Sequence, residues 1–386
     1  MGEIIITQTG GNLNRRAPSQ DYISGLAANG VAVPAGAQLG TPYTLKSLAD
    51  AKALGINADY DNSHSVLVFH HINEYFRANP SGELHLLLVA QSIGYADMLN
   101  PVNSNLHSLL KPGKIRQLAV AYNPTVPVTD FSDTEAAIDQ AQALAAAQLS
   151  HDRPLHIVLE GKGLQIGSIP DLRTKNARHV SVMAGQAMSI AATHATYAAV
   201  GTALGNISRA LVNESIGHPA AFNARGGVVE AVGVAGLWEG DVPDAKTAEI
   251  RQKGIIFLYT EDGEEGVYFS SAPACTALNS DYHSIQLNRT MNKVHRQLKA
   301  ALFPNVESQI RIDGNKLDAA DVSKLTTEAR NRLQAMYAAG EISDYDLFID
   351  PEQDVINTDT LAVQVAITPT ATASTINVTL GFTNPL

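Results

Sequence analysis

The run Leu84-His85-Leu86-Leu87-Leu88-Val89-Ala90 decides the fold class of this chain of 386 residues. All of its residues except one histidine are apolar. This is too continuous for a strand with one face in water and is typical of a strand buried on both faces. Strands of that kind belong to parallel sheets with helices on both sides, because each parallel connection needs a crossover. The run therefore predicts an α/β fold.

Similar apolar runs, with a predicted helix among them, follow along the chain. Further apolar runs lie at Ile115–Tyr122, Leu155–Glu160 and His179–Met183. An Ala-, Gln- and Leu-rich stretch between the first two begins with Ser132 and Glu135, which have the spacing of a capping box at a helix start. Strands that alternate with helices predict a mostly parallel sheet flanked by helices.

Other segments around this centre have weaker patterns. We expect a Gly- and Pro-rich loop after Leu26 and through Gly40. We also expect a long helical tract over Gln186–Ile216 that is broken at Gly201 and Gly205. The later part of the chain has a different pattern. Its expected helices and strands are Asn288–Phe303, Ala320–Ala339, Tyr345–Ile349 and Thr360–Thr368.

A short strand is expected at each end of the chain, separated from the rest by a linker. The residues are Ile4, Ile5, Ile6 and Thr7 at the N-terminus, and Thr375, Ile376, Asn377, Val378, Thr379 and Leu380 at the C-terminus. A strand without a partner exposes unpaired backbone groups. Pairing within the chain is the simpler interpretation, and pairing with another subunit is the alternative.

Composition excludes several classes of function. The net charge is −11, so nucleic-acid binding through phosphate contacts is disfavoured. Cys275 is the only cysteine, which excludes an intrachain disulfide and a thiolate metal cluster. The chain has no apolar run long enough for a membrane span and no signal peptide pattern. We therefore expect a protein made in a reducing compartment, without membrane insertion.

Motifs for cofactor or catalytic chemistry are incomplete. The stretch Gly201–Asn206 lacks the Lys and Ser/Thr of a phosphate loop, and Gly161-Lys162-Gly163 falls short of a dinucleotide fingerprint. Twelve histidines are scattered without a metal-ligand spacing. Cys275 has no sequence argument for a partner base. We predict no catalytic residue, no cofactor and no metal.

Charge is segregated along the chain. The helix Asn288–Phe303 carries Arg289, Lys293, Arg296 and Lys299 opposite its apolar stripe, and contains no acidic residue. Residues 341–386 contain seven Asp and Glu and no Lys or Arg. A solvated basic face is one interpretation. A basic ridge that docks on an acidic partner is the other.

Taken in order, these segments resemble the contractile tail sheath protein family of phages and phage-like injection systems, in its compact form. The resemblance runs over nearly the whole chain, and it rests on the ordered set rather than on one motif. The segments are Asp21–Leu26, Ser47–Ile56, His70–Leu84, Ser280–Tyr282, Asn288–Thr290 with the helix after it, Ala339–Tyr345, Leu361–Pro369 and the terminal strand.

The resemblance implies a structural subunit of hexameric rings stacked around an inner tube, which contracts to drive the tube through a target envelope. It implies an N-terminal arm (1–20), an outer α/β domain (21–275), a tube-proximal α+β domain (276–368) and a C-terminal arm (369–386). The two arms complete a sheet between subunits. The implied partners are further copies of the chain, the inner tail tube protein, and baseplate and terminator proteins. Assembly in the bacterial cytoplasm into a phage tail or contractile particle is implied as well.

The resemblance also suggests a role for the basic helix. Sheath-to-tube contact in this family is largely electrostatic, which makes Arg289, Lys293, Arg296 and Lys299 candidates for it. The helix Ala320–Ala339, which carries Lys324, Arg330 and Arg332, competes for the same role.

Two other hypotheses remain. The first is an α/β enzyme with a small-molecule site at the carboxyl ends of its strands, where Gly161–Gly167 is the first place to look. The second is a monomeric adaptor or surface protein, which leaves the two terminal strands unexplained.

Overall fold

The computed structural model describes residues 20–103, 105–224, 230–314 and 316–381. Its largest sheet has six strands in the order β2-β3-β1-β4-β5-β6. In that order the strands are Pro42–Leu45, Leu84–Ala90, Ser24–Gly30, Gln117–Ala121, His156–Glu160 and Val180–Met183. Only the edge pair β2–β3 is antiparallel. The predicted mostly parallel sheet is confirmed.

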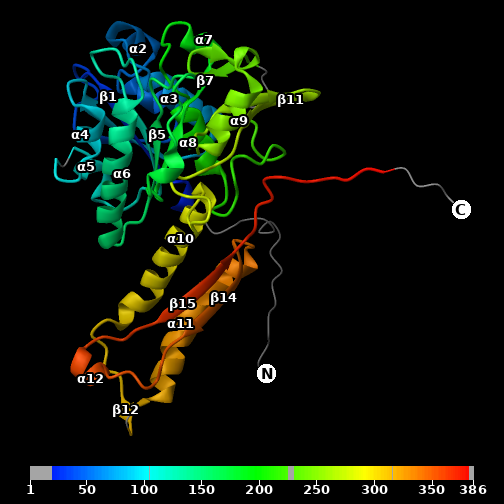
Figure 1. Cartoon of the computed structure of the whole chain (residues 1–386). Coiled ribbons are helices and arrows are strands. Elements are labelled where there is room, and N and C mark those ends of the chain that lie inside the picture. The colour runs from blue at the N-terminus through cyan, green and yellow to red at the C-terminus, as the bar shows by residue number, and fades with distance from the viewer. Residues whose placement is uncertain (1–19, 104, 225–229, 315, 382–386) are drawn as a thin grey trace, which may run out of the picture.

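Helices cover both faces of this sheet (Figure 1). Side chains of β3 alternate between two apolar cores: Leu86 and Leu88 belong to one, Leu87 and Val89 to the other. The first core includes α1 Leu48–Ala53, α2 Ala58–His64, α3 Val68–Ala78 and α8 Val200–Arg209. The second includes α4 Tyr95–Leu99, α5 His107–Leu110 and α6 Ser132–Ser150. The opening run is therefore buried on both faces, as its composition predicts.

The sequence pattern does not predict the central strand β1. Ser24–Gly30 reads SGLAANG, which is poor in the β-branched and aromatic residues that favour strands. All seven residues are buried between β3 and β4. Tertiary packing overrides weak local propensity here, and the expected loop begins only after Gly30.

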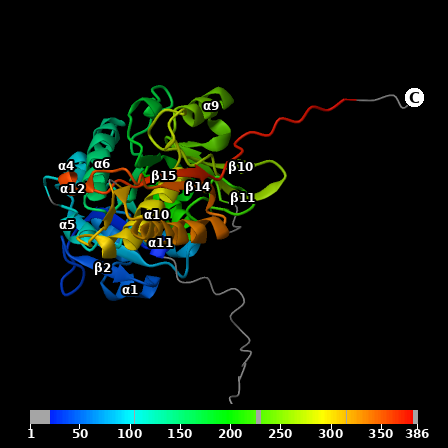
Figure 2. The same cartoon turned by 90° about the horizontal axis from the view of Figure 1, so that it is seen from below.

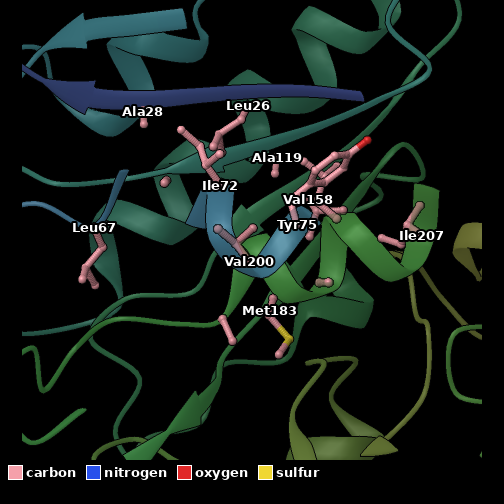
Figure 3. Packing of buried hydrophobic residues seen from close by; sticks show 14 of the residues in the cluster. Leu26, Ala28, Leu67, Ile72, Tyr75, Ala119, Val158, Met183, Val200 and Ile207 are labelled. Atoms are coloured by element: carbon pink, nitrogen blue, oxygen red, sulfur yellow. The ribbon is translucent and has the colours of Figure 1, made fainter. Parts of the chain in front are cut away.

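The expected helical tract over Gln186–Ile216 is wrong in its first half. Those residues form strand β7 Gly185–Ala187 and the short helix α7 Met188–Ala191 before α8 begins. Gly201 and Gly205 do not break α8 but lie inside it. A Cβ on Gly201 would approach the carbonyl oxygen of His71 to 2.4 Å, so the glycine allows α8 and α3 to pack closely (Figure 3).

The predicted capping box of α6 is also wrong. The N-cap of α6 is Phe131, which makes no side-chain cap, and Ser132 already lies in the helix. The backbone amide of Ser132 donates to Asp130 Oδ1 at 2.9 Å, so Asp130 satisfies the helix start. The helix itself is confirmed.

Small elements extend the α/β part of the chain. Strand β7 pairs with β8 Val232–Val234, which pairs with β9 Leu237–Trp238. Helix α9 Asp244–Gln252 precedes a hairpin of β10 Leu258–Glu261 and β11 Glu264–Phe269. Short 3-10 turns lie at η1 Gln20–Tyr22, η2 Leu172–Thr174, η3 Glu239–Asp241 and η4 Phe303–Asn305.

The C-terminal part has its own apolar core. Helix α10 Ile285–Leu302 leads from the α/β part to α11 Ala319–Ala338, with the two-residue strands β12 Ile312–Asp313 and β13 Lys316–Leu317 between them. A hairpin of β14 Ile342–Phe348 and β15 Gln364–Pro369 packs on α11, and α12 Val355–Thr358 lies in its connection (Figures 1 and 2). The C-terminal part thus combines two long helices with antiparallel hairpins.

Candidate assembly surfaces

The basic stripe of α10 is paired within the chain. The guanidinium of Arg289 is buried and donates to the carbonyl oxygens of Leu211 at 3.0 Å and Ala210 at 3.2 Å. Burial is the main cause that lowers the pKa of Arg289, to about 10. These carbonyls follow the end of α8, where backbone acceptors lack helical partners. Arg289 therefore links α10 to the α/β part through these hydrogen bonds. The interpretation of a solvated basic face is wrong for this residue, because its side chain is buried.

Lys293 and Arg296 meet a carboxylate at the start of the described chain. Asp21 lies 2.8 Å from Lys293 Nζ and 2.7 Å from an Arg296 terminal nitrogen. Lys293 Nζ also donates to Glu341 Oε1 at 2.6 Å. All four side chains are less than one-fifth exposed. Three segments far apart in the sequence therefore meet in one ion cluster at the junction of the two parts.

The last residue of the stripe is more exposed. Lys299 Nζ donates to Asp152 Oδ2 at 2.7 Å, and both side chains are almost half exposed. His295 Nε2 lies 3.0 Å from Asp152 Oδ1. An exposed pair of this kind contributes little to stability. Lys299 is thus the member of the stripe that a partner reaches most easily.

Helix α11 presents cations to solvent. Its buried side is formed by Leu325, Ala329, Leu333 and Met336. Lys324, Arg330 and Arg332 are exposed, and no ion pair involves them among the described residues.

The β14–β15 hairpin is a two-stranded sheet with no further strand beside it in the described part of the chain. The register pairs Tyr345 with Ile367 and Leu347 with Val365, and these side chains pack in the core that includes α11. Both outer edges of the hairpin lack strand neighbours there. Such edges are templates for pairing with another chain.

A segment with the pattern of a strand follows this hairpin. Ile376, Val378 and Leu380 are 82%, 72% and 89% exposed, and they alternate with Thr375, Asn377 and Thr379. The described residues 371–381 contain no strand and extend away from the domain (Figure 1). Alternate residues of a strand lie on one face, so the three apolar side chains would share one side if this segment paired as a strand. The N-terminal candidates Ile4, Ile5, Ile6 and Thr7 lie outside the described residues.

At the carboxyl end of β5, where the enzyme hypothesis places a small-molecule site, the side chains make structural contacts. The Glu160 carboxylate is fully buried and accepts from the backbone amides of Tyr122 at 2.7 Å and Ala198 at 3.0 Å. Burial raises the pKa of Glu160, and Lys162 Nζ lies 3.5 Å away. The cavity beside Gly161 measures about 210 Å³, below the usual size of a ligand pocket.

The cysteine, the metal-ligating side chains and the helices decide whether the chain carries other kinds of site. Burial raises the pKa of the Cys275 thiol to about 12, which disfavours the reactive thiolate. Among the residues described, no group of three or more His, Cys, Asp or Glu side chains is arranged to hold a metal ion. No helix in the described ranges is long and apolar enough to cross a membrane.

Comparisons with known proteins agree with this architecture. Family models described as the DUF2586 N-terminal domain and the DUF2586 C-terminal domain match residues 1–273 and 281–386. A search of curated protein sequences finds no match.

Solved structures of similar fold include chains from sheath and baseplate structures. The helical sheath of the anti-feeding prophage in its contracted state has a TM-score of 0.66 at 15% identity, with 97% of this chain and 99% of that chain covered. A chain of the anti-feeding prophage baseplate has a TM-score of 0.65 at 15% identity, over 100% and 99%. The sheath tail protein Lin1278 from Listeria innocua has a TM-score of 0.57 at 10% identity, over 90% and 92%.

These relatives are structural proteins rather than enzymes, and their likeness extends over nearly the whole chain. The chain belongs to the DUF2586 family and has the fold of contractile tail sheath proteins.

Proposed function

We propose that the chain is the sheath subunit of a contractile particle, which forms stacked hexameric rings around an inner tube and contracts to drive that tube through a target envelope. The observation that carries this proposal is the fold match to sheath chains over almost the full length. The particle is a phage tail or a phage-like injection device assembled in the bacterial cytoplasm. Its other partners are baseplate and terminator proteins.

The subunits are joined by exchange of strands. The exposed segment Thr375–Leu380 supplies one strand, and the N-terminal residues Ile4–Thr7 supply another. The free edges of the β14–β15 hairpin on neighbouring subunits receive them. Main-chain hydrogen bonds hold an added strand, and its alternate side chains give specificity. The linkers Gly10–Pro18 and Pro369–Ser374 reorient while this pairing persists, which lets rings move without separating.

The tube contact is made by exposed cations. All four cations of the stripe on α10 have partners within the chain, but Arg289, Lys293 and Arg296 are less than one-fifth exposed, whereas Lys299 is almost half exposed. Lys299 is therefore the best candidate of the stripe. Helix α11 adds Lys324 and Arg330. Exposed charge pairs contribute about 0–1 kcal/mol each, which suits a contact that must release on triggering.

Strand exchange is tested by changing one face of the C-terminal segment. In one variant, Ile376, Val378 and Leu380 are all replaced by serine. In the matched control, Thr375, Asn377 and Thr379 are replaced by serine. We expect the first variant to remain in the supernatant on ultracentrifugation and the control to pellet as polymer like the unchanged protein. Equal polymer from both variants would exclude a packed apolar face on this strand.

The tube contact is tested separately. The Lys324→Glu/Arg330→Glu variant and the Lys299→Glu variant are compared in co-sedimentation with the tube protein. Weaker tube binding with an intact sheath polymer is expected for the α11 variant at least. Unchanged binding in both variants would move the contact to another surface.

A further inference from the structure

The β10–β11 hairpin ends in an acidic tip. Glu261, Asp262, Glu264 and Glu265 are all exposed, and no ion pair neutralises them among the described residues. Glu261 and Glu264 are direct cross-strand partners. Like charges in that position destabilise a hairpin, so the isolated subunit carries an electrostatic cost that a cationic partner would remove. Figure 1 shows the hairpin projecting away from the body of the α/β part.

A basic cavity lies elsewhere on the same chain. It measures about 940 Å³ and is bordered by η1, α8, α10 and α11. Its basic side chains outnumber its acidic ones. The basic residues are Arg116, Arg209, Lys293, Arg296 and Arg332, and the acidic residues are Asp21 and Glu341.

The two acids do not neutralise this cavity. Asp21 and Glu341 are occupied by Lys293 and Arg296. Arg116 donates to the Gly113 carbonyl oxygen and to Gln20 Oε1, and its buried Nε has no acceptor in the ranges that the structure describes. Burial, together with the nearby Arg296, lowers the pKa of Arg116 to about 10.

The other two arginines add to this excess of positive charge. Among the described residues, Arg209 donates to the neutral oxygens of Asn206 and Ala221 and to no carboxylate. Arg332 is exposed and has no ion pair among the described residues. The cavity is therefore lined by three guanidinium groups, those of Arg116, Arg209 and Arg332, that have no carboxylate partner among the described residues.

We propose that the acidic tip of one subunit docks into the basic cavity of a second copy of this chain. The inference rests on the proposed sheath function and names one of its contacts between subunits. A contact between two different surfaces of the same chain is heterologous, and such contacts generate rings or helical polymers. Complementary charge of this kind fixes register and speeds association.

The charge of the terminal segments disfavours them as occupants. Residues 360–386 contain no charged side chain. Residues 1–19 contain Arg15 and Arg16 against the single acid Glu3, which is the wrong sign for this cavity. The acidic tip is the occupant with matching charge.

Charge reversal tests the contact in the full-length protein. We expect Glu264→Lys/Glu265→Lys and Arg209→Glu/Arg332→Glu each to raise the critical concentration for polymerisation by about tenfold or more, and their combination to restore most of the loss. The control Asp59→Lys/Asp139→Lys reverses two exposed acids on α2 and α6 and should leave that concentration unchanged. Circular dichroism checks that each variant is folded.

Disulfide cross-linking detects the same contact between subunits and does not require that tubes form. A chain with Glu264→Cys and Arg332→Cys should form disulfide-linked dimers and larger ladders on a non-reducing gel, while buried Cys275 stays unreacted. If polymerisation is normal but insensitive to reversal and no ladder forms, the contact is wrong and the sheath function stands. If no polymer forms in any variant, the sheath function fails, and the presence or absence of linked dimers still decides the contact.

Discussion

The ion cluster around Asp21 offers the sharpest test of how the two parts of the chain are joined. Replacing Asp21 by asparagine keeps the shape of the side chain and removes its charge. Lys293 retains Glu341, but Arg296 loses its only carboxylate among the described residues. Arg116 and Arg296, which already repel each other, lose the nearby negative charge as well.

The size of the effect follows from burial. The side chains of Asp21 and Arg296 are 15% and 17% exposed, so the pair is neither a surface pair nor a fully dry one. A hydrogen bond to a charged group contributes about 1.5–3 kcal/mol, and breaking a fully buried pair costs about 3–5 kcal/mol. We expect Asp21→Asn to lower the free energy of unfolding of the junction by about 2–3 kcal/mol.

Hydrogen exchange of the amides in α10, measured by mass spectrometry, isolates this junction from the rest of the chain. Exchange in the middle of α10 should accelerate by about 30-fold or more, which corresponds to about 2 kcal/mol, while α6 stays unchanged. Asp139→Asn, an exposed change in α6, is the control. Equal protection of α10 in Asp21→Asn and the unchanged protein would refute the view that this cluster holds the junction.

Three further predictions follow. Gly201→Ala should lower the free energy of unfolding of the α/β part by about 1–3 kcal/mol in urea, because the new Cβ would meet the His71 carbonyl oxygen. The control Gly167→Ala should be neutral, because a Cβ at that position meets no atom within 4 Å. His156→Gln should flatten the loss of stability on acidification. Burial lowers the folded-state pKa of His156 to about 3, so its contribution is complete above the unfolded value near 6.5 and is lost as the pH falls toward 3. Deleting residues 370–386 should abolish sedimentable polymer while the far-ultraviolet circular dichroism of the folded chain persists; polymer from the truncated protein would contradict strand exchange.

The buried strands of the main sheet could be predicted from sequence because burial on both faces leaves a continuous apolar run. Leu84–Ala90 was located to the residue on that basis. Strand β1 could not be predicted in this way, because its small residues show no apolar run and no alternation. Only its position between β3 and β4 makes this segment a strand. The expected helix break at Gly201 is wrong for a similar reason. Glycine destabilises an isolated helix, but in the folded chain it permits close packing between α8 and α3.

The basic stripe of α10 was visible in the sequence, but its partners were not. Asp21 and Asp152 lie far from this helix along the chain, and only the fold brings them together. Charge periodicity shows which residues share a helix face and does not show what covers that face. The tube contact of the stripe therefore stays a prediction, and Lys299 is the residue best placed for it.

Electron microscopy of the purified full-length protein tests the central claim most directly. The sheath function predicts hollow tubes built of stacked six-membered rings, in which the segment Thr375–Leu380 of one subunit adds a strand to the β14–β15 hairpin of a neighbour. A protein that remains monomeric at every accessible concentration, with both terminal segments intact, would contradict it.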